Sequence, residues 1–297
     1  MAASPGREGQ GARGSARVEI DLAPQRMFVL EERLTFEEIR QRAMDKRTTA
    51  IASGIGGLLQ RPRTEDIVPL GSQRRVQPFW YVSGKARYVY ERTREYTVPP
   101  SGPEVREVEV HGTTYAIGDT AKGRGFHIPV RERCREEFAD ELVIDGVTGE
   151  AAPELNLVRN GPAIEVATPE ELAKDDTVVI SPEHRASFVV RQLLTRMMKP
   201  VQADTIVEET LTLDHTDLFY RPVYAFEFHW VPKDKRGVVE IDGVTGTVRQ
   251  APMLPANITR IVSKDALFDI GADTVGLLVP GGSIAVKVAR AAVDRNY

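Results

Sequence analysis

Cysteine is almost absent from this sequence. Among 297 residues there is one, Cys134. A single cysteine cannot form a disulfide within the chain or supply a cysteine-based zinc cage. This composition is typical of a reducing cytoplasm, which we predict as the location. Arginines flank Cys134 on both sides and favour a reactive thiolate. A catalytic cysteine also needs a base and an oxyanion donor, so we interpret Cys134 as inert.

Compact motifs for catalysis or metal binding are also missing. The five histidines are scattered, and no two have the spacing of a helical metal pair. Residues 53–57 (Ser-Gly-Ile-Gly-Gly) are rich in glycine, but the Gly-Lys-Ser/Thr of a phosphate loop does not follow. We therefore predict no catalytic residue, no metal and no cofactor. An enzyme that uses dispersed Asp, Glu or His residues in a cleft remains the alternative.

Long apolar runs and a strong net charge are lacking too. Residues 264–279 and 283–293 are apolar but too short and too charged to cross a membrane, so we predict no transmembrane span. The formal net charge of −4 argues against general nucleic-acid binding. Residues 1–17 have no apolar stretch of the kind found in secretory signals, and we predict a disordered tail there.

The strongest positive feature is a repeated hexapeptide. Ile-Asp-Gly-Val-Thr-Gly occupies residues 144–149 and again 241–246, an offset of 242 − 145 = 97. Each copy follows a β-branched run, and Asp-Gly after such a run predicts a tight turn. The alternative is that the two aspartates are ligand or metal carboxylates, but no second ligand stands at a useful spacing. The predicted turn residues are Asp145, Gly146, Gly149, Asp242, Gly243 and Gly246.

The order of elements before each turn is also repeated. Helical apolar spacing at residues 48–62 and 187–200 ends in each case at a proline. A strand and then a proline-aromatic strand follow, at 77–82 in the first copy and 221–226 in the second. The shared order predicts that one unit was duplicated.

Two short sequence patterns predict a helix start and a β-hairpin. Thr35 stands three residues before Glu38, which is the capping-box pattern of a helix start. Valines at 105–110 lead into His111-Gly112, and 113–117 returns, which predicts a β-hairpin.

We predict an α+β fold of two related modules, each an antiparallel sheet packed by a helix, plus a C-terminal helical element. The ranges follow from the repeat and from the loop between its copies. The predicted parts are a disordered tail (1–17), a first module with an inserted β-hairpin (18–155), a second module (156–255) and the C-terminal helical element (256–297).

Aromatic residues gather in the two proline-aromatic strands. From Tyr224 to Trp230 they alternate with polar residues, the period of a strand with one buried face. If exposed, the same residues would form a platform for a partner or for single-stranded nucleic acid. The candidate binding residues are Phe79, Trp80, Tyr81, Tyr224, Phe226 and Trp230.

The second repeat resembles a known module. Residues 226–248 comprise a strand, a charged turn (Lys-Asp-Lys-Arg-Gly), a strand and the Asp-Gly-Val-Thr-Gly turn, which is similar to the end of PepSY-type modules. The resemblance implies small α+β units engaged in protein–protein contact or inhibition. It supplies no functional residues to carry over.

These patterns lead to one functional hypothesis. We predict a non-catalytic protein-binding or assembly component, a scaffold that binds a protein partner or associates with itself as an oligomer, through residues 264–293. The alternatives are an enzyme with its site between the modules, and single-stranded nucleic-acid binding through the aromatic and basic strands.

Overall fold

A computed structural model describes residues 18–51, 62–198, 200–251, 262–270 and 284–288. The predicted tail, residues 1–17, lies outside this part. The strands are β1 (Val18–Leu22), β2 (Gln25–Leu30), β3 (Ile67–Val98), β4 (Glu107–Val110), β5 (Thr113–Ala116), β6 (Gly118–Thr120), β7 (Gly123–Asp145), β8 (Ala163–Val166), β9 (Val178–Val179), β10 (Thr205–Trp230), β11 (Lys235–Asp242), β12 (Val248–Ala251) and β13 (Ile284–Val288). The helices are α1 (Phe36–Asp45), α2 (Arg47–Ile51), α4 (Leu155–Arg159), α5 (Ala186–Met197) and α6 (Lys264–Phe268), with 3-10 turns at Thr64–Asp66, Pro169–Leu172 and Val231–Lys233.

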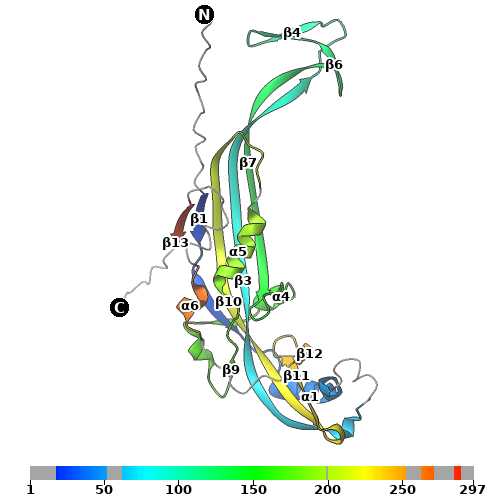
Figure 1. Cartoon of the computed structure of the whole chain (residues 1–297), viewed down its shortest axis with the longest axis vertical. Coiled ribbons are helices and arrows are strands. Elements are labelled where there is room, and N and C mark those ends of the chain that lie inside the picture. The colour runs from blue at the N-terminus through cyan, green and yellow to red at the C-terminus, as the bar shows by residue number, and fades with distance from the viewer. Residues whose placement is uncertain (1–17, 52–61, 199, 252–261, 271–283, 289–297) are drawn as a thin grey trace, which may run out of the picture.

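Three long strands organise the molecule. β3 has 32 residues, β10 has 26 and β7 has 23. β3 lies between the other two and is antiparallel to both. At 3.3 Å per residue, β3 spans about 100 Å. Residues 84–98 of β3 and 126–140 of β7 form an elongated arm, with β4 and β6 at its far end from α1 (Figure 1).

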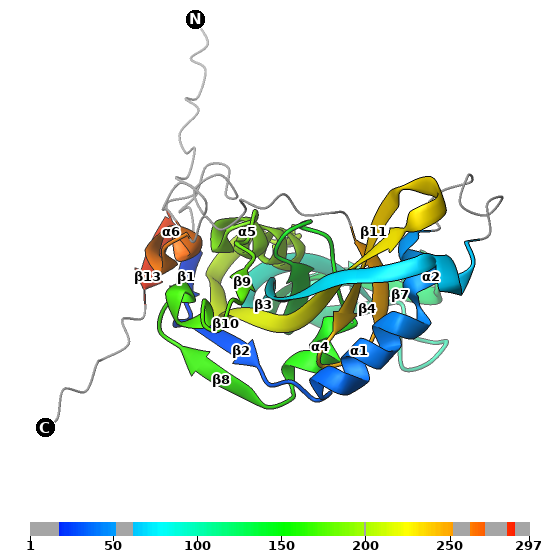
Figure 2. The ribbon, with the colours of Figure 1, turned by 90° about the horizontal axis from the view of Figure 1, so that it is seen from below.

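Shorter strands extend this sheet at the other end. β11 pairs antiparallel with the end of β10, and β12 pairs with β11. The N-terminal strands β1 and β2 run parallel to β10, and β13 runs parallel to β1. The result is one large mixed sheet, with α1 and α2 beside β11 and with α6 near β1 (Figure 2).

The largest core lies between this sheet and α5. Helix α5 contacts β3, β7 and β10, and its apolar side buries Val189, Val190, Leu193 and Leu194 completely. Full burial of one such side chain contributes about 1.5–3 kcal/mol. Trp80 lies in the same core, and its indole N–H donates to the carbonyl of His184 at 2.7 Å. The helix predicted for residues 187–200 is thus confirmed as α5.

Two smaller cores flank the repeated turns. In one, Ile39 and Ala43 of α1 pack on the strands β10 and β11. In the other, Leu155 and Val158 of α4 pack against Phe79 on the opposite side of the sheet. The Thr35–Glu38 capping box and the β4–β5 hairpin with its turn at His111-Gly112 are also confirmed.

The predicted fold class is wrong. The chain is mostly β, and a single sheet passes through both predicted modules because β3 of the first pairs along its length with β10 of the second. The α+β pair of helix-packed modules therefore does not exist. Only residues 48–51 of the predicted helix at 48–62 are helical in the described part, as the end of α2, and residues 52–61 lie outside it.

Pro78 and Pro222 occupy unusual positions in this sheet. Proline in the middle of a sheet removes a ladder hydrogen bond and is therefore typical of strand ends. Here each proline lies inside a long strand, but level with the point where the neighbouring strand turns away. The Pro78 carbonyl accepts from Gly146 at 3.0 Å, and the Pro222 carbonyl accepts from Gly243 at 2.9 Å. The neighbouring strand therefore has no carbonyl group at this position that needs the N–H which proline lacks.

The predicted C-terminal helical element is also corrected. Residues 264–268 form the short helix α6, but residues 284–288 form a strand that pairs with β1. Leu267 and Phe268 are buried, and the Phe268 ring meets Trp80 edge-on at 5.1 Å. These described parts pack on the chain itself, whereas residues 271–283 and 289–297 lie outside the described residues.

Candidate functional site

The two repeated turns have the same hydrogen bonds. The Asp145 Oδ1 atom accepts from the backbone N–H groups two and three residues later, at 2.9 and 3.0 Å. The Asp242 Oδ1 atom does the same at 2.8 and 2.9 Å. Gly149 and Gly246 both have φ of 73°, a backbone conformation that favours glycine. In both copies the aspartate thus closes a tight turn through its own side chain.

A local two-fold relation places the turns on either side of one residue pair. In the β3–β10 ladder Gln77 lies opposite Arg221. The equivalent prolines are separated by 222 − 78 = 144 positions, and the same separation relates Gln77 to Arg221. The local two-fold axis therefore passes between Gln77 and Arg221, with the Asp145 turn on one side and the Asp242 turn on the other.

The equivalent residues Gln77 and Arg221 make different contacts. Arg221 donates to the Asp242 Oδ2 atom at 2.9 Å. Gln77 instead donates to Glu240 at 3.0 Å, and its amide oxygen accepts from Arg221 at 3.2 Å. Within the described residues, the Oδ2 atom of Asp145 has no hydrogen-bond partner. The two turns thus have the same geometry, but a neutral glutamine lies at the position beside one of them and a charged arginine at the position beside the other.

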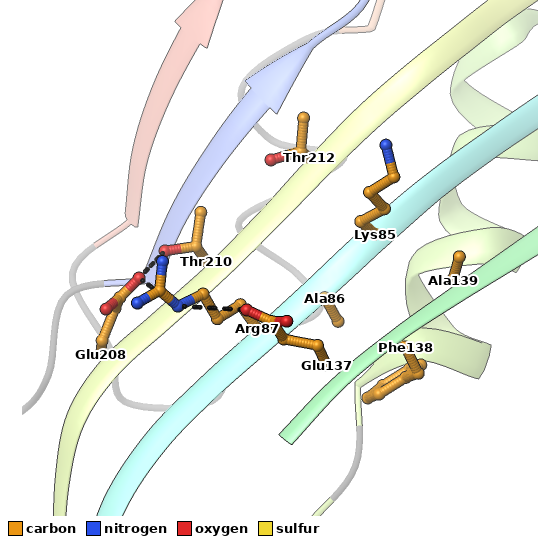
Figure 3. Close-up of a pocket in the computed structure, with 9 residues that line it drawn as sticks. All are labelled: Lys85, Ala86, Arg87, Glu137, Phe138, Ala139, Glu208, Thr210 and Thr212. Atoms are coloured by element: carbon orange, nitrogen blue, oxygen red, sulfur yellow. Dashed lines mark hydrogen bonds and ion pairs between the residues drawn. The ribbon is translucent and has the colours of Figure 1, made fainter. Parts of the chain in front are cut away.

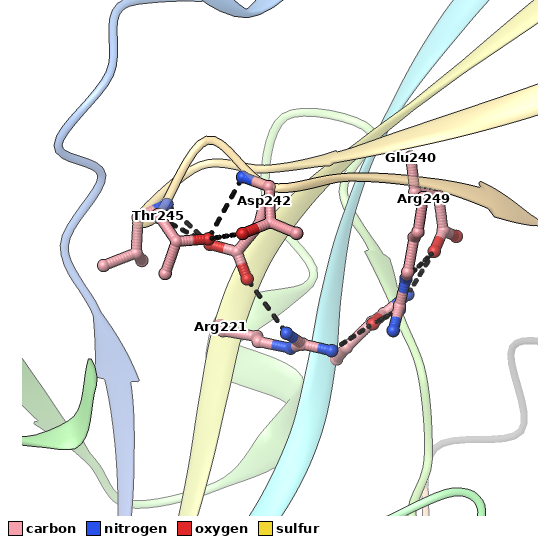
Figure 4. Close-up of polar contacts among 8 residues, drawn as sticks. Arg221, Glu240, Asp242, Thr245 and Arg249 are labelled. Atoms are coloured by element: carbon pink, nitrogen blue, oxygen red, sulfur yellow. Dashed lines mark hydrogen bonds and ion pairs between the residues drawn. The ribbon is translucent and has the colours of Figure 1, made fainter. Parts of the chain in front are cut away.

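Arg221 belongs to a network of charged residues around Glu240 (Figure 4). Glu240 binds Arg75 at 2.8 Å and Arg249 at 2.9 Å, and the Arg75–Glu240 pair is buried. Burial, followed by repulsion from Arg249, lowers the pKa of Arg221, while Asp242 and then Asp145 act in the opposite direction. The buried Arg221 Nε atom has no hydrogen-bond partner among the described residues.

A cleft of about 290 Å³ opens between the two turns, and a second hollow of about 280 Å³ adjoins it. Both are lined by Asp145 and Arg249. The first also holds Arg221, Asp242 and Glu154. Carboxylates and guanidinium groups at this spacing can bind a small polar molecule. The arginines, Asp242 and Glu240 already neutralise one another, which leaves the Oδ2 atom of Asp145 and the carboxylate of Glu154 as the available groups among the described residues.

The six aromatic residues predicted as a binding surface are all buried. Their exposed fractions run from 0% to 8%, and they divide among the three cores. Phe79 stacks on Phe219 at 5.3 Å, and Trp80 packs under α5. The structure therefore presents them as core residues and not as an exposed platform. The buried face predicted from the alternation of residues 224–230 is confirmed.

The outer edge of β7 is the longest open strand edge of the described residues. β3 covers one side of β7 throughout, and β6 pairs only with residues 123–125. Between 126 and 142 no described strand lies on the other side. Unpaired edges of this kind are templates for another strand.

The hydrogen bonds at the end of β7 show which backbone groups point outward. The Val143 carbonyl accepts from Ala152, and the Asp145 N–H donates to Glu150, both away from β3 and both at 2.9 Å. Residues of one strand alternate in the side to which their N–H and C=O point. No bulge interrupts the β3–β7 register. The odd-numbered residues from 131 to 141 therefore direct both groups outward.

The side chains of these odd-numbered residues are exposed on an open face of the sheet. This face contains a depression of about 520 Å³ over β3, β7 and β10 (Figure 3). Arg87 lies within it and pairs with Glu208 at 3.3 Å and Glu137 at 3.6 Å. The even-numbered residues face α5 instead, and among them Cys134 and Phe138 are half-buried against the main core.

Cys134 is placed away from its flanking arginines. Arg133 and Arg135 point to the open face, whereas Cys134 points to the side of α5. In the described part of the chain no group of three His, Cys, Asp or Glu side chains is arranged to hold a metal ion. No helix among the described residues is both long and apolar enough to cross a membrane.

Comparison with protein-family models, with curated proteins and with solved structures finds no match for this chain. The resemblance to PepSY-type modules therefore stays a prediction.

Sequence reasoning found the turns but missed the residues beside them. Gln77, Arg221, Glu240 and Arg249 come together from four strands, and only the 144-residue offset of the two prolines relates the first pair. The edge of β7 was also missed because its residues are mostly charged and lack the apolar alternation that predicts a strand.

Proposed function

We propose that this chain is a non-catalytic protein-binding or assembly component that adds a partner strand to the outer edge of β7. One observation carries the proposal. Among the described residues, the outward N–H and C=O groups of the odd-numbered residues 131–139 have no partner, although β3 pairs with β7 along this stretch. At Glu141 the N–H donates to the Asp140 side chain at 2.9 Å. A partner strand would receive a series of backbone hydrogen bonds there, as in β-strand addition. This edge replaces residues 264–293 as the proposed contact region.

A proline at position 133 tests the proposal. The Arg133 N–H points outward, so Arg133→Pro blocks the edge without removing a hydrogen bond to β3. Arg133→Ala is the matched control, because it removes the same side chain and keeps the N–H. We expect proteins captured from native extract by the wild-type chain to be retained by Arg133→Ala and lost by Arg133→Pro. Equal capture by the two variants would count against the edge.

An enzyme or ligand-binding protein with its site between the turns is the second candidate. It is favoured by the convergence of Asp145, Glu154 and Arg221 on one cleft. A small-molecule screen that reads the unfolding temperature tests it. A ligand that stabilises the wild-type chain and Arg133→Pro, but not Asp145→Asn, would favour this candidate. The absence of such a ligand leaves the edge proposal as the better account.

A further inference from the structure

We propose that the strand added to β7 is β7 of a second copy of this chain, antiparallel to the first and centred on Glu136. The two strands would pair from Val130 to Leu142 around a two-fold axis perpendicular to the sheet. This inference rests on the proposed function and specifies its partner. Three observations lead to it: the direction of the backbone groups, the ends of the open edge and the order of the charges.

The backbone directions allow this register. In a pair centred on residue 136, position i lies opposite position 272 − i, so odd-numbered residues meet odd-numbered residues. Because these residues point their N–H and C=O outward, each such pair from 133 to 139 exchanges two hydrogen bonds. At the Arg131–Glu141 pairs the Glu141 N–H must first leave the Asp140 side chain, to which it donates at 2.9 Å. Glu136 points its backbone groups toward β3 and would meet its own copy in the close, non-hydrogen-bonded pair at the axis.

In the same register, the two ends of the open β7 edge stop the pairing at equivalent positions. The next odd-numbered pair would be Pro129 with Val143. Pro129 has no N–H, and the Val143 carbonyl is already occupied by Ala152. Both members therefore stop the ladder at the same step. The usable edge is symmetric about Glu136, as a two-fold contact requires.

The charges on the open face select this register among its neighbours. Centred on Glu136, Arg135 lies opposite Glu137 and Arg131 lies opposite Glu141, and the two-fold axis repeats both pairs. Opposite charges across strands stabilise pairing, and like charges destabilise it. Centring the contact on Cys134 instead would place Arg133 opposite Arg135.

Centring the contact on Arg135 or on Glu137 leaves one kind of opposite-charge pair on this face, formed by Arg133 with Glu137 or with Glu141 respectively. The register around Glu136 has two kinds. Charges on an edge commonly prevent pairing between chains. Here the order of positive and negative residues brings opposite charges together when the strand pairs with an antiparallel copy of itself.

On the face toward α5, the register brings Cys134 opposite Phe138, both half-buried at the main core. It also brings Glu132 opposite Asp140. Each of these carboxylates already has a cation, Arg92 at 2.5 Å for Glu132 and Arg196 at 2.9 Å for Asp140. Their repulsion across the contact is therefore largely compensated within each copy.

The unfavourable contact is Glu136 with its own copy. Each Glu136 accepts a hydrogen bond from Tyr90 at 2.7 Å, which stabilises but does not neutralise the carboxylate. Removal of this charge tightens the dimer. The register thus makes an uncommon prediction, that Glu136→Gln strengthens association while changes at Arg135 or Glu137 weaken it.

Light scattering of the full chain during size exclusion tests the dimer and its register together. We expect a mass of about 66 kDa for the wild type, twice the 32.9 kDa of one chain. Arg135→Glu and Glu137→Arg should each raise the dissociation constant about tenfold through like-charge contacts. The double variant Arg135→Glu/Glu137→Arg should restore it.

A cysteine at the axis gives a second, independent readout. In a Cys134→Ser background, Glu136→Cys should form an intermolecular disulfide under mild oxidation, because the close pair has the required Cα separation. Arg133→Cys in the same background should not, because its opposite residue is Ala139. Cross-linking of the position-133 variant but not of the position-136 variant would overturn the register.

The outcomes separate this inference from the proposed function. A wild-type chain that runs at 33 kDa at all concentrations overturns self-pairing. If Arg133→Pro still abolishes capture of another protein, the proposed function stands with a different partner. If the chain is a dimer that Arg133→Pro and the charge variants leave intact, the dimer forms elsewhere and self-pairing of β7 is overturned, while equal capture by Arg133→Pro and Arg133→Ala overturns the proposed function.

Discussion

At the residue scale, the two aspartates of the repeat have the same local role and different surroundings. Both hold a turn through one carboxylate oxygen. The second oxygen of Asp242 neutralises the buried Arg221, whereas the second oxygen of Asp145 faces a cleft. Removing one partner of a buried pair leaves an uncompensated charge, which costs more than losing an exposed one.

Substitution by asparagine should therefore affect the two positions unequally. Asparagine keeps the oxygen that accepts the turn N–H groups and removes the negative charge. We expect Asp242→Asn to lower the free energy of unfolding by about 3 kcal/mol, because Arg221 loses its charged partner. Asp145→Asn should change it by less than about 0.5 kcal/mol. Urea denaturation of both variants measures the difference, and equal losses would show that Arg221 does not depend on Asp242.

At the element scale, the hairpin of β3 and β7 is stabilised by charged networks as well as by its ladder. Glu132 binds Arg92 and accepts from Tyr96 at 2.6 Å. The hydrogen bond from Tyr96, then that from Arg92, lowers the pKa of Glu132 below 4.5. Helix α5 braces the same hairpin through its buried apolar side and through the Arg196–Asp140 pair.

The lowered pKa of Glu132 predicts a pH effect of definite sign. A carboxylate whose pKa is lower in the folded state contributes stability above its unfolded pKa, and this is lost as the pH falls through the folded value. We expect the wild-type chain to lose more stability than Glu132→Gln between about pH 5 and pH 3. Glu95→Gln, exposed on the same hairpin, is the control. Parallel stability curves for wild type and Glu132→Gln would contradict the prediction.

The packing of α5 predicts a large stability effect at one position. Leu193 is completely buried between α5 and the sheet. Leu193→Ala should lower the free energy of unfolding by about 2–5 kcal/mol, because it leaves a cavity in the main core. Arg191→Ala on the exposed side of the helix should change it by less than about 0.5 kcal/mol. Thermal and urea unfolding of both variants provide the comparison.

Short sequence patterns were sufficient to predict individual helices and turns. The Thr35–Glu38 capping box, the apolar spacing of α5 and the Asp-Gly turns each depend on residues a few positions apart. The same local reasoning predicted separate short strands at 77–82 and 221–226, because it could not show that each belongs to one long strand that continues through its proline. The repeat then suggested two modules, because no local pattern shows that β3 pairs with β10 in one sheet.

At the scale of the whole molecule, one sheet joins segments that are far apart in the chain. β10 pairs with β3, with β11 and with the N-terminal strands β1 and β2. The network around Glu240 depends on this pairing, because its residues come from β3, β10, β11 and β12. No local pattern relates these residues, which is why the candidate cleft could not be predicted from the sequence.

The far part of the arm extends the same sheet beyond the end of β10, where β3 and β7 pair with each other (Figure 1). Its outward edge is long and rich in mixed charge. In the proposed assembly the edge continues into a partner strand, so that the sheet extends across two chains. The predicted duplication would then concern the part of the sheet around the two repeated turns. The arm would provide the contact with a second chain.

Amide hydrogen exchange along β7 tests the central claim most directly. We predict that the outward N–H groups of odd-numbered residues 131–139 exchange slowly when the chain is concentrated enough to associate, and rapidly after dilution or in Arg133→Pro. The inward N–H groups of the even-numbered residues should remain slow throughout, because β3 binds them. Rapid exchange of the outward groups at every concentration, with no added partner able to slow it, would contradict the account.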